Sequence, residues 1–113
     1  MPATIESITA TKGSPADALT IWKQVNVWTW IGMGARASRV IRCEDGIRVA
    51  IYLGAGTHKR TLIIKLNGAD LYDIEIGRVR RSDFEWIVEA QDRDIYAEDL
   101  GRALRDLYDS VKV

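Results

Sequence analysis

The sequence predicts an α+β fold in which five or six antiparallel strands form one sheet, with an N-terminal helix and a C-terminal amphipathic helix packed on it. Residues 71–79, LYDIEIGRV, alternate apolar and charged side chains with the period of two that a half-buried strand requires. Asp-Gly at residues 45–46 and Asn-Gly at residues 67–68 are typical of the short turns that join antiparallel strands. Over residues 94–110 the apolar side chains recur with a period near 3.6, which predicts a helix with one buried face.

The N-terminal part of the chain predicts a tail, a helix and a strand. Residues 1–13 show no clear period and are expected to form a tail, which leaves residues 14–113 as a single domain. A Ser-Pro pair at residues 14–15 supplies a capping side chain and a first helical residue that needs no N–H donor, so a helix is predicted to run to about Val25. Residues 27–33, VWTWIGM, are rich in β-branched and aromatic side chains and predict a strand.

The middle of the chain predicts a series of hairpins. Residues 39–53 contain two apolar stretches around a turn at residues 44–46, and a glycine-rich loop at residues 54–58 follows them. Three further strands are predicted, over residues 61–67, 71–79 and 84–90.

The strand that ends at Val79 is predicted to carry an irregularity. Gly77 interrupts the alternation, and Val79 resumes it one position out of phase. This pattern predicts a β-bulge, in which one extra residue increases the local twist and re-aims its neighbours. The bulge is expected to place Arg78, Arg80 and Arg81 in solvent at one end of the strand.

The alternation divides the sheet into a buried and a wet face. The buried face is predicted to contain Ile47, Val49, Ile51, Leu62, Ile64, Leu66, Tyr72, Ile74, Ile76, Phe84, Trp86 and Val88. The wet face is predicted to contain Arg48, Ala50, Tyr52, Ile63, Lys65, Asp73, Glu75, Glu85, Ile87 and Glu89. Four apolar residues on the wet face predict partial cover by the N-terminal helix, a second subunit or a partner. Scattered apolar side chains are also common on protein surfaces, so exposure is the alternative.

The net charge of zero conceals an uneven distribution. Residues 36–81 contain ten Lys and Arg against five Asp and Glu, a balance of +5, whereas residues 82–113 contain four against nine, a balance of −5. If these parts fold apart, the surface is dipolar and steers a polyanion or an acidic protein patch to one side. The alternative is that the two parts pair with each other across the sheet.

The chain is expected to be a cytoplasmic protein without membrane contact. Cys43 is the only cysteine, so no intrachain disulfide can form, and a buried, inert thiol in a reducing compartment is expected. No apolar run approaches the roughly 20 residues that span a bilayer. The N-terminus also lacks the pattern of a signal peptide.

Few residues favour catalysis, and no catalytic, cofactor-binding or metal-binding residue is predicted. His58 is the only histidine, which excludes a metal site built from several histidines, and no spacing indicates a Cys-His or Ser-His-Asp arrangement. Asp73 and Glu75 lie two apart on one strand face, but cations on neighbouring strands explain these carboxylates more simply. The glycines at residues 32–37 and 54–60 match nucleotide-binding loops only in composition, because a strand and not a helix is predicted after each.

Basic and aromatic residues make nucleic-acid binding an alternative. Aromatic platforms beside cationic grooves hold single strands without sequence preference. The residues predicted for such an interface are Trp28, Trp30, Arg36, Arg39 and Arg42, together with Arg78, Arg80 and Arg81. Two of the four tryptophans, Trp22 and Trp86, fit core positions instead, and the chain as a whole is not basic.

Three strings carry a resemblance to known proteins: MGAR at residues 33–36, YDIEIGRVR at residues 72–80 and IYAEDLGRAL at residues 95–104. Together they resemble a family of short proteins from bacteriophage, prophage and other mobile-element genomes, for which we know of no assigned activity. The resemblance covers residues 17–109 and departs at residues 26–34, where the family has a glycine-rich turn, so the tryptophan pair is not carried over. It implies an accessory protein of a mobile element and supplies no catalytic residue.

The leading hypothesis is a non-enzymatic protein that binds a host or phage protein and thereby inhibits a host defence system. The residues predicted to contact that partner are Arg48, Tyr52, Ile63, Lys65, Arg78, Arg80, Arg81 and Ile87. An apolar patch of Tyr52, Ile63 and Ile87 is also expected to support a homodimer. The alternative hypothesis is the single-stranded nucleic-acid interface.

Overall fold

The computed structural model describes residues 18–43, 45–53 and 58–111. Its elements are α2 (Ala18–Gln24), α3 (Val27–Gly32), the 3-10 turn η1 (Ala37–Arg39), β1 (Val40–Cys43), β2 (Gly46–Leu53), β3 (His58–Leu66), β4 (Tyr72–Val79), β5 (Trp86–Ile95), the 3-10 turn η2 (Ala97–Asp99) and α4 (Leu100–Val111). The predicted tail, the predicted start of the first helix and most of the glycine-rich loop lie outside the described residues.

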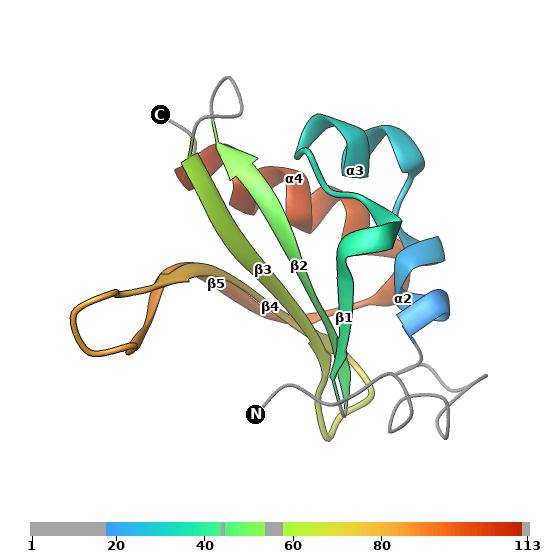
Figure 1. Cartoon of the computed structure of the whole chain (residues 1–113). Coiled ribbons are helices and arrows are strands. Elements are labelled where there is room, and N and C mark those ends of the chain that lie inside the picture. The colour runs from blue at the N-terminus through green and yellow to red at the C-terminus, as the bar shows by residue number, and fades with distance from the viewer. Residues whose placement is uncertain (1–17, 44, 54–57, 112–113) are drawn as a thin grey trace.

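The five strands form one antiparallel sheet in the order β1-β2-β3-β4-β5, in which each strand pairs with its neighbours along the chain. Figure 1 shows α4 crossing behind this sheet, with α2 and α3 beside its β1 edge. The predicted α+β class is therefore confirmed, as is the hairpin that joins β1 to β2.

One face of the sheet forms the hydrophobic core with the helices. The buried strand residues on this face include Ile47, Val49, Ile51, Leu62, Ile64, Tyr72, Ile74 and Ile76, as the alternation predicts, and Leu53 and Ile95 join them. The helices add Ile21, Trp30, Leu100, Leu104 and Tyr108, and the link between α2 and α3 adds Val25. Burying each large aliphatic side chain contributes roughly 1.5–3 kcal/mol, so this layer is the main source of stability. Leu66, predicted to be buried, is only half-buried at the end of β3.

Residues 27–33, predicted as a strand, form the helix α3 instead. The Asn26 side-chain oxygen accepts a hydrogen bond from the backbone N–H of Trp28 at 2.8 Å and caps the helix. The next turn stacks Trp30 on Trp22 with a ring-centroid distance of 4.2 Å. The Trp30 indole N–H also donates to the Trp22 carbonyl at 3.0 Å. Burial of Trp30 in the core therefore outweighs the β-propensity of the segment.

The last strand and the last helix both begin later than predicted. β5 continues to Ile95, and α4 starts only after η2. The prediction that Phe84, Trp86 and Val88 are buried is wrong. Phe84 precedes β5 and is 82% exposed. Trp86 and Val88 belong to the strand but lie on the face away from the core.

An extra residue in β5 explains this reversal. The pairing of β4 with β5 shifts after Ile76, which leaves Glu89 as the inserted residue of a β-bulge. The sequence predicts this bulge at Gly77, and the irregularity does lie there, but the inserted residue belongs to the partner strand. A Cβ atom on Gly77 would lie 2.2 Å from the Ile87 carbonyl oxygen, so the close approach of the strands requires glycine. A second register shift lies near the C-terminal end of β5.

Candidate functional site

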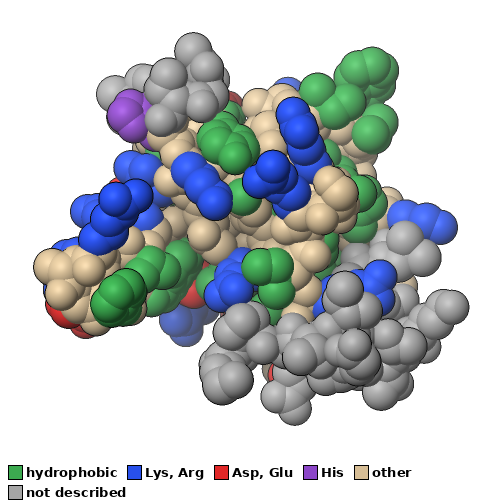
Figure 2. All heavy atoms as spheres, in the orientation of Figure 1, with side chains coloured by type: hydrophobic (Ala, Val, Ile, Leu, Met, Phe, Trp, Pro, Cys, Tyr) green, Lys and Arg blue, Asp and Glu red, His purple; other side chains and the backbone are tan. Residues whose placement is uncertain are grey.

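The face of the sheet opposite α4 is covered by none of the described helices, and we call it the open face. Its side chains alternate with the core positions along the strands, and they include Ile41, Arg48, Ala50, Tyr52, Lys59, Thr61, Ile63, Lys65, Asp73, Glu75, Val79 and Trp86. Figure 2 shows Lys and Arg side chains gathered over this face, with hydrophobic side chains between them. The described part of the N-terminal helix does not provide the predicted cover, because α2 packs into the core through Ile21, as does Val25 just after it.

Three shallow hollows adjoin one another on the open face and beside its β1 edge. The first is lined by Ile31, Gly34, Ala35, Arg36, Arg39 and Tyr52. The second is lined by Ser38, Arg39, Val40, Ile41, Arg48, Ala50, Lys59, Thr61 and Val79. The third is lined by Lys59, Arg60, Thr61, Arg78, Val79 and Arg81. Arg39 lines the first two hollows and Lys59 lines the last two, so together they form one groove, and none of these lining residues is acidic.

We call this groove the cationic groove, and its free cations are Arg36, Arg39, Arg48, Lys59 and Arg81. Within the described ranges, none of these five side chains lies within ion-pair distance of a carboxylate. Their positive charge is therefore available to a ligand without first breaking an ion pair in that part of the protein.

Four other cations of the described residues, Arg60, Arg78, Arg80 and Arg102, form ion pairs. Arg60 and Arg78 reach from neighbouring strands to the same carboxylate, that of Glu89, at the bulge. Arg102 on α4 contacts Asp99 at 3.1 Å. Arg60 and Arg78 also line the third hollow, so at that end of the groove part of the positive charge is already paired.

Two carboxylates of the open face bond to neutral donors instead of groove cations. Glu75 accepts a hydrogen bond from the Trp86 indole N–H at 3.0 Å. Asp73 accepts from the Asn67 amide at 2.9 Å and from the backbone N–H of Asp94 at 3.1 Å. Both carboxylates belong to the β4–β5 side of the face, which leaves the basic side along β1, β2 and β3.

The structure brings together only part of the predicted protein-binding set. Arg48, Tyr52, Ile63 and Lys65 share the open face. Ile87 and Arg78 pair with each other on the face that carries the core, because the bulge reverses the alternation of β5. The apolar patch predicted from Tyr52, Ile63 and Ile87 is therefore divided between two faces, and this prediction is corrected.

The two remaining arginines of the predicted protein-binding set, Arg80 and Arg81, both lie in the turn between β4 and β5, but only Arg80 is ion-paired among the described residues. The Arg80 guanidinium donates to both Asp83 oxygens, at 3.0 and 2.7 Å, and also to Glu85. The bond from Arg80 holds the pKa of the Asp83 carboxyl below its usual value, and the same bond raises the pKa of Arg80. Arg81, in the same turn, has no such partner in the described residues and lines the end of the groove.

This contact predicts that the turn loses order in acid. The pKa of Asp83 is lower in the folded state than in the unfolded chain. The stabilisation of the turn by its carboxylate is therefore complete above the ordinary carboxyl pKa, and it is lost as the pH falls through the lowered pKa. Amide hydrogen exchange of Phe84, whose N–H donates to the Arg80 carbonyl at 2.7 Å, should accelerate in that acidic range beyond the intrinsic pH effect. Asp83→Asn should remove the transition. The same acid transition in Asp83→Asn would show that another carboxyl is responsible.

The predicted nucleic-acid residues are also divided. Arg36 and Arg39 line the cationic groove, whereas Arg42 lies on the face that carries the core. Trp30 is buried, so it is excluded as a stacking platform. Trp28 is 74% exposed but lies on α3, outside the groove lining.

Lys59 lies between the predicted loop and the predicted strand, so the sequence did not assign it to the open face. The strand was predicted to start at residue 61, whereas β3 starts at His58. Continuing the alternation of β3 backward by one pair from Thr61 would have placed Lys59 on the open face.

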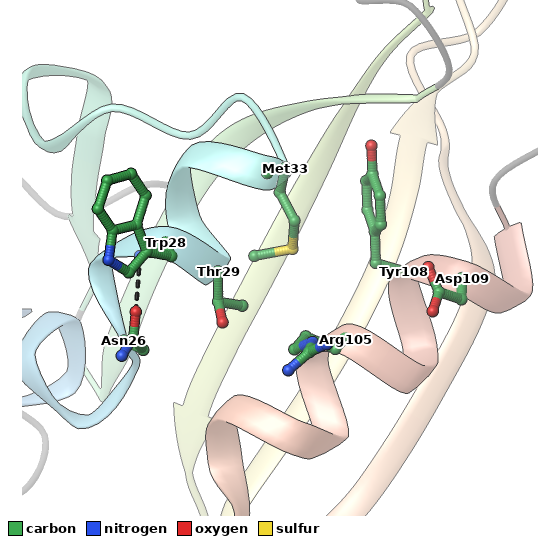
Figure 3. Close-up of a pocket in the computed structure, with 8 residues that line it drawn as sticks. Asn26, Trp28, Thr29, Met33, Arg105, Tyr108 and Asp109 are labelled. Carbon is green, nitrogen blue, oxygen red and sulfur yellow. Dashed lines mark hydrogen bonds between the residues drawn. The ribbon is translucent and has the colours of Figure 1, made fainter.

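A separate hollow of about 590 Å³ lies between α3 and α4. Its lining is Asn26, Trp28, Thr29, Gly32, Met33, Arg105, Tyr108 and Asp109, and Figure 3 shows side chains of the two helices facing it. The Tyr108 hydroxyl donates to the Tyr52 carbonyl at 2.5 Å, which ties α4 to β2. The hollow contains neither histidine nor cysteine, and no cluster of three or more potential metal ligands occurs among the residues described.

No family model, curated protein or solved structure matches this chain. In residues 18–43, 45–53 and 58–111, none of the helices has both the length and the apolar character needed to cross a bilayer.

Proposed function

We propose that the protein binds single-stranded nucleic acid along the cationic groove. The observation that carries this proposal is the set of five cations that have no ion-pair partner among the described residues, in a groove whose described lining contains no carboxylate. A polyanion bound there releases its condensed counterions, which favours the complex most strongly at low salt.

The groove offers both kinds of contact that a single strand uses. Arg48 and Lys59 come from neighbouring strands, and Arg39 comes from the segment just before β1, so successive phosphates can meet them in turn. Ile41 and Val79 are 42% and 52% exposed between these cations and can contact sugars and bases. Sheet surfaces that combine phosphate and base contacts are common platforms for single strands.

Removing two groove cations should weaken this binding and flatten its salt dependence. In the double variant Arg48→Ala/Lys59→Ala, each lost phosphate contact should reduce the slope of log affinity against log salt by about 0.7. We expect a total reduction of about 1.4 and an affinity loss of about tenfold at low salt. Fluorescence anisotropy with labelled oligothymidylate over a salt series measures both quantities.

The matched control is Arg102→Ala/Arg105→Ala on α4, which changes the net charge equally but lies outside the groove. This control should bind as the wild type does. Equal losses in the two double variants would show that total charge, not the groove, is responsible. Absence of oligothymidylate binding at low salt would exclude the proposal.

A protein partner with an acidic surface is the second candidate, and the exposed apolar residues of the groove favour it. In this case the five cations meet carboxylates, and the protein acts in the host cytoplasm as a mobile-element accessory protein that inhibits a host defence system. Binding to an acidic polypeptide such as polyglutamate, without binding to oligothymidylate, would favour this candidate over nucleic acid.

A further inference from the structure

The turn between β4 and β5 follows the end of the cationic groove and carries one exposed aromatic side chain on a backbone that hydrogen bonds hold in place. Figure 1 shows this hairpin projecting from the rest of the sheet. Its tip is held by the backbone bond from Arg80 N–H to the Glu85 carbonyl at 2.8 Å and by the bonds from the Arg80 guanidinium to Asp83 and Glu85. Phe84 lies inside this ring of contacts, so its backbone is held in place while its side chain is 82% exposed.

The backbone of Phe84 adopts a conformation that is unfavourable for a bulky residue. Its φ angle is +58°, in the left-handed region that glycine, asparagine and aspartate tolerate best. The other non-glycine residues with positive φ in the described chain, Asp70 and Asp94, are aspartates. Because the Phe84 ring is almost fully exposed, packing within the described protein does not offset this cost. Such strain at an exposed residue points to a role outside the fold.

The position of the hairpin connects this ring to the cationic groove. Arg81 belongs to the same turn and lines the third hollow together with Lys59 and Val79. Val79 pairs directly with Trp86, so the turn that carries Phe84 begins where the groove lining at Val79 ends. Phe84 is not part of the groove lining, but a strand whose phosphates follow the groove to Arg81 reaches the turn that carries Phe84, three residues further along the chain.

We infer that Phe84 stacks on an unpaired nucleobase and gives the groove a preference for single strands over duplexes. This inference rests on the proposed function and deepens it, because the cations alone attract any polyanion. Stacking on an exposed aromatic ring requires a base whose face is free, and bases within a duplex are already stacked on their neighbours. The Arg80 contacts already hold the backbone of Phe84, so less conformational entropy is lost when its ring stacks on a base.

The test replaces Phe84 with asparagine, a residue that accepts positive φ and removes the ring without perturbing the backbone. Phe84→Asn should lose about tenfold in affinity for oligothymidylate while its salt slope stays that of the wild type. Its affinity for an abasic oligonucleotide and for a duplex should not change, because neither offers a free base to the ring. The denaturant midpoint of the variant should equal or exceed that of the wild type, since the strained φ is relieved.

The control is Trp28→Ala, which removes another exposed aromatic ring from a position outside the groove lining and should leave oligothymidylate binding unchanged. Phe84→Trp should retain the single-strand preference. Unchanged oligothymidylate affinity in Phe84→Asn would overturn the stacking role while leaving the groove proposal intact. Equal losses for the abasic strand would also overturn it, by showing a contact that does not use bases. If the wild type binds neither strand nor duplex, the proposed function itself fails.

Discussion

Trp30→Ala should lower the free energy of unfolding by about 3–5 kcal/mol, the range observed when a buried tryptophan is truncated. The Trp30 side chain is 1% exposed, and its removal leaves a cavity between α3 and the core. The variant also loses the stacking on Trp22, worth about 0.5–1.5 kcal/mol beyond buried area, and the indole hydrogen bond to the Trp22 carbonyl. Denaturant unfolding followed by far-ultraviolet circular dichroism is the appropriate measurement, because the substitution also removes a fluorophore.

The matched control lies two residues earlier in the same helix. Trp28→Ala removes an exposed ring of the same size, and it keeps the backbone N–H that Asn26 caps. Its effect should stay within about 0.5 kcal/mol, as for most surface substitutions. If Trp30→Ala is too unstable to measure, Trp30→Phe should give an intermediate loss. Equal small losses for both tryptophans would contradict the packing of α3 described above.

Gly77→Ala should destabilise the protein by about 2–3 kcal/mol, at the upper part of the range for overpacked sites. The added methyl would meet the Ile87 carbonyl oxygen at 2.2 Å and the Trp86 ring at 2.9 Å. A side chain can rotate away, but the backbone oxygen cannot, so β4 and β5 must separate. The unfolding midpoint in denaturant and the amide exchange of β5 should both report this separation.

Gly101→Ala provides the comparison for the same chemical change. No heavy atom outside its own helix turn and chain neighbours lies within 4 Å of the added methyl, and the position belongs to α4. Replacing a helical glycine by alanine stabilises by roughly 0.5–1 kcal/mol, so the two substitutions should change stability in opposite directions. A stabilising or neutral Gly77→Ala would refute the close approach of β5 at the bulge.

The sheet could be predicted because its determinants are local. The period-2 alternation of residues 71–79 and the turn dipeptides at residues 45–46 and 67–68 act within a few positions along the chain. The helix α3 could not be predicted from the same reasoning. Its formation depends on the contact of Trp30 with Trp22, eight residues away, which no propensity of the segment itself reports.

The residues of the candidate site could be predicted where the alternation of side chains along a strand determines which face they occupy. Arg48 and Lys65 occupy the open face as their positions in the pattern require. The placement of Ile87 failed, because inserting Glu89 into β5 changes which face every earlier residue of that strand occupies. Arg39 and Lys59 line the same hollow although they are 20 residues apart, so their proximity depends on tertiary structure and not on a local pattern. The segment before β1 lies against β2, where the Tyr52 N–H donates to the Met33 carbonyl at 2.8 Å.

The two register shifts in the pairing of β5 also limit the pairing of a further strand with this edge of the sheet. β5 is an outer strand, and outer strands with unpaired N–H and C=O groups serve as templates for a further chain. Here the shifts bend the strand, and Glu89, Asp92, Arg93 and Asp94 place charges along it. Such a border disfavours fibril growth and the addition of an extended peptide to the sheet. A ligand must then be recognised by side chains and not by main-chain pairing at β5.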